Sequence, residues 1–235
     1  MPKRHFLFFT NLKIINMKKI DTVIIDFDST ILDGELLEMI AHIAFEGDNR
    51  REEKVAEIEK ITALGMEGKI SFSDSLSRRL SLIPITAEVI NKCIRETRAR
   101  INKDFVDNLK IFSGKEVYVV SGGYKNIIDA VSGDICINKD KIFANEFLMK
   151  GNRVVGVDSA NPLAQSDGKV QIAKLIRSEG KKLMIGDGMT DYYVRRDGGA
   201  DIFVAYTAIA KREAVIEKAD FQIKSFSELT AINGF

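Results

Sequence analysis

The chain has 235 residues, a length that accommodates one large domain or one core with a modest insertion. Apolar residues make up 45% and charged residues 29%, which is typical of globular proteins and excludes disordered, collagen-like and mucin-like chains. Lysine and arginine number 35 against 34 aspartates and glutamates, which leaves a formal charge of +1. Without a net positive field we expect neither a nucleic acid nor a membrane as a partner, so any anion must be bound locally.

The first 20 residues carry a basic start and a short apolar run over 6–9. This run is too short for the apolar core of a signal peptide, so we interpret 1–20 as an N-terminal extension, with Met17 as an alternative natural start. No stretch of about 18 apolar residues occurs, which excludes a membrane span. Cys93 and Cys136 lie far apart, which argues against a zinc ribbon or a disulfide framework and favours a reducing cytoplasm.

Short apolar runs rich in β-branched residues recur along the chain and predict strands that are buried on both faces of a parallel sheet. The expected strands cover 22–26, 116–121, 181–187, 201–206 and 220–224. Helical patterns lie between them at 126–131, 168–180 and 209–219. Such alternation is typical of an α/β fold with a Rossmann-like, doubly wound parallel sheet.

Two segments interrupt this alternation. Residues 34–100 show only helical periodicity, which predicts a helical cap inserted after the first strand. The segment 141–158 has a Lys-Gly-Asn turn at 150–152 between two alternating runs, so we expect a β-hairpin there. The resulting division assigns 21–33 and 101–235 to the core and 34–100 to the cap.

Polar side chains follow the predicted strands where loops converge on one edge of a parallel sheet. They are Asp26 and Asp28 after the first strand, Ser121 and Gly122 after the second, Asp187, Thr190 and Asp191 after the third, and Lys169 at a helix start. Clustered carboxylates with a lysine and a serine suit a phosphate and a hard cation, and Mg²⁺ is the expected cofactor. Only two histidines occur, so hydrolysis would have to use carboxylates, lysine and metal.

The residues that follow the first predicted strand resemble a motif of a known family. Residues 26–30, Asp-Phe-Asp-Ser-Thr, match the DxDx[TV] signature of the haloacid dehalogenase superfamily of phosphatases. Ser121, Lys169 and the run Gly-Asp-Gly-Met-Thr-Asp at 186–191 match its three later motifs in the same order. From about Asp21 to the C-terminus the chain resembles the phosphoserine phosphatase branch of that superfamily.

The resemblance implies roles for the core residues. Asp26 is the expected nucleophile that forms an aspartyl phosphate, and Asp28 is the general acid and then the general base. Mg²⁺ is expected to bind the Asp26 carboxylate, the Asp28 backbone carbonyl and Asp187, with Asp191 orienting the water shell of the metal. The phosphoryl oxygens are expected to contact Ser121, the Gly122 amide and Lys169.

The resemblance also implies contacts to the rest of a substrate. Glu35 corresponds to the acidic residue that receives an amino group, and Arg79 to the arginine that binds a carboxylate, with the adjacent Arg78 as the alternative. Further expected substrate contacts are the apolar cap residues Met66 and Phe72, which close over the site, and Thr190.

The resemblance implies a Mg²⁺-dependent phosphomonoesterase that hydrolyses O-phospho-L-serine to L-serine and phosphate in the last step of serine biosynthesis. One alternative is hydrolysis of another small phosphomonoester, such as phosphothreonine or a phosphorylated amine or alcohol. Others are phosphotransfer to an acceptor other than water and a non-catalytic phosphate-sensing module. We expect a cytoplasmic monomer or homodimer whose partner is a small-molecule phosphomonoester.

Overall fold

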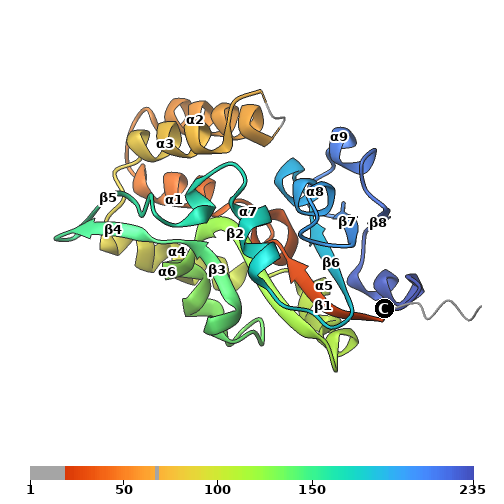
Figure 1. Ribbon diagram of the computed structural model, residues 1–235. Coiled ribbons are helices and arrows are strands. Elements are labelled where there is room, and N and C mark those ends of the chain that lie inside the picture. Colours follow the sequence, from red (N-terminus) through yellow and green to blue (C-terminus); the bar gives the residue numbers. More distant parts are fainter. Residues whose placement is uncertain (1–18, 67–68) are drawn as a thin grey trace, which may run out of the picture.

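The computed structural model of the chain describes residues 19–66 and 69–235, so most of the predicted extension lies outside the described residues. At its centre is a six-stranded parallel sheet with the strand order β3-β2-β1-β6-β7-β8 (Figure 1). The strands are β1 (Ile20–Ile25), β2 (Glu116–Tyr124), β3 (Ile142–Asn145), β6 (Lys181–Gly186), β7 (Ile202–Tyr206) and β8 (Phe221–Ile223). The predicted α/β fold with a Rossmann-like parallel sheet is confirmed.

Both faces of this sheet are buried, as the continuous apolar runs of its strands require. Val23 and Ile25 of β1 point to one face and pack with the helical insertion and the C-terminal segment. Ile24 between them points to the other face, which is covered by α7 (Gly168–Leu175) and α8 (Met189–Arg196). Two shorter helices pack on the first face. In the sequence, α5 (Lys103–Asp107) precedes β2 and α6 (Lys125–Ile128) follows it.

Residues between β1 and β2 are helical, as predicted. The helices are α1 (Leu36–Ala44), α2 (Arg51–Met66), α3 (Phe72–Leu82) and α4 (Ala87–Ala99). In Figure 1, α2 and α3 lie side by side as an outer layer, with α1 between them and the sheet. The hydroxyls of Ser71 and Thr86 cap α3 and α4 by accepting backbone amides of the first turn.

The hairpin predicted over 141–158 is shorter in the structure. Residues 142–145 form β3, which pairs parallel with β2 in the main sheet. The hairpin consists of β4 (Phe147–Lys150) and β5 (Arg153–Val157), which pair antiparallel. A single residue, Glu146, separates β3 from β4, so the two strands look like one alternating run in the sequence.

The helix predicted over 168–180 is also shorter, because α7 ends at Leu175. The Lys182 ammonium on the neighbouring strand β6 donates to the carbonyls of Ala173 and Ile176, both at 2.7 Å. Carbonyl groups in the last turn of a helix lack intrahelical partners, and a cation stabilises them. The helix therefore ends where the sheet supplies a donor for its last carbonyls.

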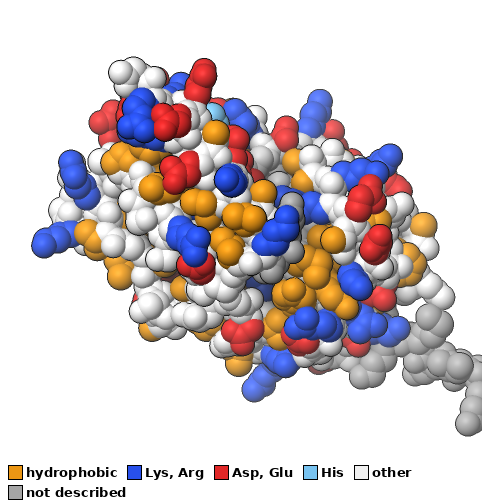
Figure 2. Space-filling model, turned by 90° about the horizontal axis from the view of Figure 1, so that it is seen from above, with side chains coloured by type: hydrophobic (Ala, Val, Ile, Leu, Met, Phe, Trp, Pro, Cys, Tyr) orange, Lys and Arg blue, Asp and Glu red, His pale blue; other side chains and the backbone are white. Residues whose placement is uncertain are grey.

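The surface carries charges of both signs. Seen from above the outer helices, lysines and arginines are interspersed with aspartates and glutamates (Figure 2). This distribution agrees with the formal net charge of +1. None of the described helices combines the length and the apolar character that are needed to cross a bilayer.

The start of α7 depends on close contact between two backbone segments. A Cβ at Gly168 would overlap the Pro162 carbonyl and lie 2.6 Å from Leu163 Cα. We expect Gly168→Ala to lower the free energy of unfolding by about 1–3 kcal/mol, because backbone atoms would have to move. Chemical denaturation measures the loss. Gly133→Ala is the matched control, since a Cβ there meets nothing within 4 Å, and equal stability of both variants would contradict the prediction.

Candidate active site

The loop after β1 brings two carboxylates to one place. The Asp26 amide donates to the Ile185 carbonyl of β6 at 2.9 Å, so the sheet fixes the position of Asp26. The chain then turns sharply, because Ser29 adopts a left-handed conformation with a φ of 51°. The Asp28 carboxylate accepts the Leu36 amide at 3.1 Å, at the start of α1. Both aspartates line the same cavity.

Lys169 lies beside Asp26 at the start of α7. Its ammonium is 2.6 Å from Asp26 Oδ2 and 2.7 Å from Asp191 Oδ1, and only 8% of its side chain is exposed. Burial by itself lowers the pKa of Lys169, but Asp191 and Asp26 outweigh this effect and raise the pKa above its ordinary value. Lys169 is therefore a cation inside the cavity at neutral pH.

Three buried carboxylates are close enough to share a metal ion. Oxygens of Asp26, Asp187 and Asp191 lie within 4.8 Å of one another. Both oxygens of Asp191 already have donors, since Oδ1 accepts from Lys169 and Oδ2 accepts from the Gly188 amide at 3.0 Å. Asp26 and Asp187 line the cavity, and their carboxylate oxygens are ligands that Mg²⁺ prefers, so the donor set fits this ion.

Asp28 keeps its proton more readily than an ordinary aspartate. Burial raises the pKa of Asp28 well above its usual range, and the negative charges of Glu35 and Asp26 raise it further. A protonated carboxyl can donate to a leaving group, whereas Asp26 is paired with the Lys169 cation. The two aspartates therefore suit the roles of acid and nucleophile.

The end of β2 forms another wall of the cavity. Ser121 is fully buried, and its Oγ accepts the Gly123 amide at 2.9 Å, so the hydroxyl proton is available to a ligand. Gly122 lines the cavity. A Cβ at Gly122 would lie 2.7 Å from the Phe72 ring, so the absence of a side chain lets the α3 residue Phe72 approach.

Asn145 holds this wall in place, although the sequence analysis assigned it no role. It is fully buried at the end of β3, and its Nδ2 donates to the carbonyls of Gly122 at 2.9 Å and Leu163 at 3.1 Å. The sequence feature that could have identified Asn145 is a polar residue at the end of an apolar run. That signal is informative only when β3 is recognised as a strand of the main sheet.

Of the two candidate arginines on α3, the structure places Arg79 at the cavity. Arg79 is 6% exposed and lines the cavity. Arg78 points to solvent and pairs with Asp74 at 2.8 Å. Consecutive helical residues differ in direction by about 100°, so only one of the two can face the core.

Three of the other predicted substrate contacts, Glu35, Phe72 and Thr190, lie at the cavity. Glu35 precedes α1, and its Oε1 accepts the Ser29 hydroxyl at 2.7 Å. Glu35, Phe72 and Thr190 all line the cavity. The side chain of Met66 lies outside the described residues, so its contact stays a prediction.

Arg212 joins the site from a segment to which the sequence analysis assigned no function. The helix predicted over 209–219 is limited to α9 (Glu213–Ile216), and the backbone at Arg212 is extended. The Arg212 guanidinium contacts Asp187 and lies 3.4 Å from Glu35 Oε1. The signal for Arg212 is its place in the chain: the segment follows β7, which ends on the same edge as β1 and β6.

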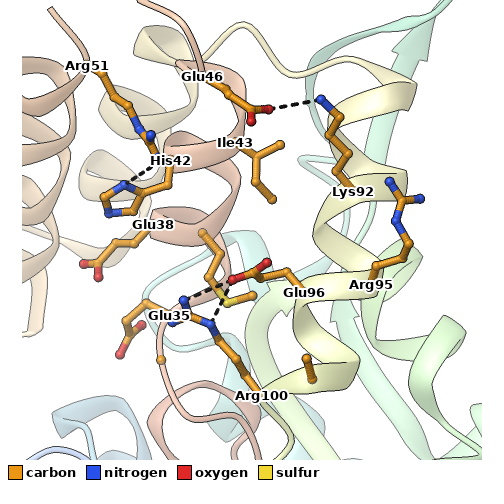
Figure 3. A pocket seen from close by; sticks show the side chains of 13 residues that line it. Glu35, Glu38, His42, Ile43, Glu46, Arg51, Lys92, Arg95, Glu96 and Arg100 are labelled. Atoms are coloured by element: carbon orange, nitrogen blue, oxygen red, sulfur yellow. Dashed lines mark hydrogen bonds and ion pairs between the residues drawn. The ribbon is translucent and has the colours of Figure 1, made fainter.

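The cavity enclosed by these residues measures about 40 Å³, enough for a few water molecules. A groove of about 690 Å³ adjoins it at Glu35, between α2 and residues 209–215. Another cleft, of about 680 Å³, lies between α1 and α4 (Figure 3). No aspartate lines this cleft, and charges across it pair with one another, as Lys92 does with Glu46 at 3.1 Å. The chemistry therefore belongs to the small cavity.

Comparison with known proteins agrees with this geometry. The model of the haloacid dehalogenase-like hydrolase family matches residues 23–195, which include the aspartates, Lys169 and the helical insertion. The chain belongs to this family. The membership explains why the aspartates, the lysine and the serine come together at one edge of the sheet.

The hydrolase is similar to the chloroplastic phosphoserine phosphatase of Arabidopsis thaliana, with 31% identity over 219 residues that cover 90% of this chain and 71% of that protein. A solved phosphoserine phosphohydrolase-like protein from Francisella tularensis subsp. tularensis SCHU S4 matches with a TM-score of 0.80 and 32% identity, over 90% of this chain and 99% of that chain. A phospho-aspartyl intermediate analogue of phosphoserine phosphatase matches with a TM-score of 0.70 and 27% identity, over 92% and 100% of the two chains.

We expect Mg²⁺ to stabilise Arg212→Gln more than the wild-type hydrolase. Removal of the guanidinium leaves the buried Asp187 carboxylate without its cation, and a bound metal ion replaces the lost charge. Thermal unfolding should therefore show a lower Tm for the variant without Mg²⁺ and a smaller difference with it. Arg195→Gln is the control, because Arg195 pairs with the partly exposed Asp220. If Mg²⁺ reduced the difference in Tm between Arg195→Gln and the wild type to the same extent, a role of Arg212 at the metal site would be contradicted.

Proposed function

We propose that the hydrolase is a Mg²⁺-dependent phosphomonoesterase that converts O-phospho-L-serine and water to L-serine and phosphate. The observation that carries this proposal is one cavity in which Asp26, Asp28 and Lys169 meet Glu35 and Arg79. The first three residues suit phosphoryl transfer, and the last two offer one anion and one cation to an amino acid zwitterion. The similarity to a phosphoserine phosphatase of Arabidopsis thaliana supports the same substrate.

Asp26 is the proposed nucleophile. The Phe27 amide donates to its Oδ1 at 2.7 Å and Lys169 contacts its Oδ2, so the carboxylate is held in one orientation. A carboxylate oxygen attacks phosphorus while the ester P–O bond breaks, which transfers the phosphoryl group to Asp26. Asp28, whose proton is retained by burial, protonates the leaving serine oxygen.

The second half of the reaction restores both aspartates. Asp28, now ionised, accepts a proton from a water molecule, which attacks the aspartyl phosphate and releases phosphate. Asp26 is freed and Asp28 is again protonated. A solved phosphoserine phosphatase that holds a phospho-aspartyl intermediate analogue supports this two-step route.

The charge of the transferring phosphoryl group is stabilised by donors that are already in place. Lys169, the Ser121 hydroxyl and the Gly122 amide are the proposed donors. Mg²⁺, when bound to Asp26, the Asp28 backbone carbonyl and Asp187, supplies further positive charge. Asp191 acts through Lys169 and the Gly188 amide, both of which it holds by hydrogen bonds.

Glu35 and Arg79 are the proposed contacts of the amino acid part. Glu35 offers its carboxylate to the ammonium group, and the buried Arg79 offers its guanidinium to the carboxylate. Phe72 approaches Gly122 and closes the cavity against water, with Met66 as the predicted second apolar contact and Thr190 on the same wall.

We also propose that residues 34–100 act as a mobile cap on a core formed by 21–33 and 101–235. The cavity of about 40 Å³ is smaller than a phosphorylated amino acid, so helix α3, which carries Phe72 and Arg79, must move away for the substrate to enter. The adjoining groove beside Glu35 is the proposed entrance for the substrate.

We place the enzyme in the cytoplasm, as a monomer or homodimer in the last step of serine biosynthesis. Cys93 and Cys136 are both free, in keeping with a reducing compartment. Its partner is a small-molecule phosphomonoester, and the interspersed charges of the surface in Figure 2 do not favour a polyanion.

Phosphate release from a panel of small phosphomonoesters tests the proposal. We expect O-phospho-L-serine to have the highest kcat/KM, ahead of phosphothreonine, phosphoethanolamine and glycerol phosphate, and we expect EDTA to abolish turnover. Asp26→Asn should be inactive, because a neutral amide does not attack phosphorus. Asp140→Asn, which alters an exposed aspartate, should retain full activity.

Three other results of the phosphate-release assay would each favour a different function. Preference for another ester would refute the substrate assignment and leave the phosphoryl chemistry intact. Transfer of phosphate to an added alcohol instead of water would identify a phosphotransferase. A folded wild-type protein that turns over none of the esters would favour a phosphate-sensing module.

Lys169→Met should lower kcat by about 10²–10³-fold, because a pre-placed cation at the phosphoryl group is lost. Steady-state kinetics with O-phospho-L-serine measure the effect. Lys174→Met is the matched control, since Lys174 lies on the same helix α7 and is exposed. A similar kcat for the two variants would show that Lys169 has only a structural role.

A further inference from the structure

Arg79 is buried, and it forms no ion pair with a carboxylate among the described residues 19–66 and 69–235. Its Nε donates to the Ser75 carbonyl and its Nη1 to Thr62 Oγ1, both at 3.2 Å. Of the ion pairs within residues 19–66 and 69–235, those on α3 belong to the neighbouring Arg78. Burial without a counter-ion is unfavourable for a guanidinium, so its charge is available to the carboxylate of a ligand.

Thr62 supports Arg79 from the neighbouring helix α2. Thr62 is 5% exposed, and its hydroxyl donates to the Ile58 carbonyl at 3.0 Å while it accepts from Arg79. A hydroxyl has one proton and two lone pairs, so one lone pair remains free in this arrangement. Glu38 of α1 lines the same groove as Thr62, and the Thr62 hydroxyl lowers the pKa of the Glu38 carboxyl.

Glu38 extends this group of polar side chains to a third helix, because it lines the groove beside Thr62. Figure 3 shows the carboxylates of Glu35 and Glu38 on the side of α1 that faces away from Lys92 and Arg95. Burial raises the pKa of Glu38 to about 7, and Glu35 and Glu59 add to this effect, while Thr62 and Arg79 oppose it. Glu38 thus changes its charge close to neutral pH.

We propose that Thr62 and Glu38 are positioning residues that hold the Arg79 guanidinium for the substrate carboxylate, and that ionised Glu38 competes with that carboxylate. Neutral Glu38 donates its proton to the free lone pair of Thr62 and leaves the full charge of Arg79 to the ligand. When Glu38 is ionised, the Thr62 hydroxyl donates to the Glu38 carboxylate in place of the Ile58 carbonyl. Only the Thr62 hydroxyl then separates this negative charge from the Arg79 guanidinium. This inference rests on the proposed function.

The surrounding charges give the pH effect its direction. The charges of Glu35, Glu59 and Arg79 act on Glu38, with His42 4.0 Å from Glu59 and Arg212 3.4 Å from Glu35. Other charged residues that line the groove or cleft with Glu38 are Lys211, Arg212, Glu213, Glu46, Arg51, Lys92, Arg95, Glu96 and Arg100. Loss of a proton from Glu38 near neutral pH makes this region more negative. Binding of a carboxylate at Arg79 should therefore weaken as the pH rises through neutrality.

Thr62→Val removes the hydroxyl and keeps the shape of the side chain. We expect KM for O-phospho-L-serine to rise about tenfold with kcat nearly unchanged, because a charged donor loses its partner. Phosphoethanolamine has the amine but no carboxylate, so its KM should change much less. Thr62→Ser should restore the wild-type KM, and Thr97→Val is the matched control, since it removes a buried hydroxyl on α4 that contacts Cys93.

Glu38→Gln removes the charge and keeps the hydrogen-bonding shape. In the wild type, the ratio of kcat/KM for O-phospho-L-serine to that for phosphoethanolamine should fall roughly threefold or more from pH 6 to pH 8. In Glu38→Gln the ratio should be independent of pH, because an amide does not ionise. Both substrates carry the same phosphate and an amine, so their own ionisation cancels in the ratio.

The outcomes separate this inference from the proposed function. A wild-type enzyme that does not prefer O-phospho-L-serine to phosphoethanolamine would refute the proposed substrate, and the inference with it. A wild-type preference that survives Thr62→Val, or a pH dependence that survives Glu38→Gln, would overturn the inference alone. A KM effect that is limited to O-phospho-L-serine, rescued by Thr62→Ser and absent in Thr97→Val supports it.

Discussion

The ion pairs of the buried Lys169 ammonium hold the site together. A cation with 8% exposure is stable only beside anions, so the end of β1, the start of α7 and the first turn of α8 must converge on one point. Glycine makes this convergence possible, because a Cβ at Gly186 would overlap the Asp191 carboxylate. The interaction that stabilises the folded core thus also brings the proposed nucleophile Asp26, the proposed phosphate-binding cation Lys169 and Asp191 together.

Asp26 and Asp28 are only two residues apart, but their surroundings suit them to different proposed roles. Asp26 continues the sheet and meets Lys169, whereas the left-handed turn at Ser29 directs Asp28 toward α1 and Glu35. Burial and the nearby negative charges favour the protonated form of Asp28. Acid and nucleophile are therefore distinguished by backbone geometry and not by residue type.

The sequence predicts the part of this site that depends on strong local signals. The apolar runs before Asp26 and Asp187 predict the parallel strands, and the rule that ligands bind at the carboxyl ends of such strands brings the two residues together. Asn145 and Arg212 are missed because each depends on a neighbouring element that the pattern misassigns, β3 as half of a hairpin and 209–212 as helix. The choice between Arg78 and Arg79 depends on how α3 is rotated against the core, which tertiary packing decides and periodicity in a charged helix does not.

The helical insertion connects substrate choice to closure of the cavity. Phe72 and Arg79 lie on the same helix, so the proposed closing movement would bring the Phe72 ring over Gly122 and bury the guanidinium at the same time. A substrate with a carboxylate supplies the counter-ion that Arg79 needs when it is buried, whereas a phosphoester without one leaves the charge unpaired. Under the proposed function, discrimination between substrates would therefore arise in the closed state, and a substrate that fails to stabilise closure would lose turnover as well as affinity.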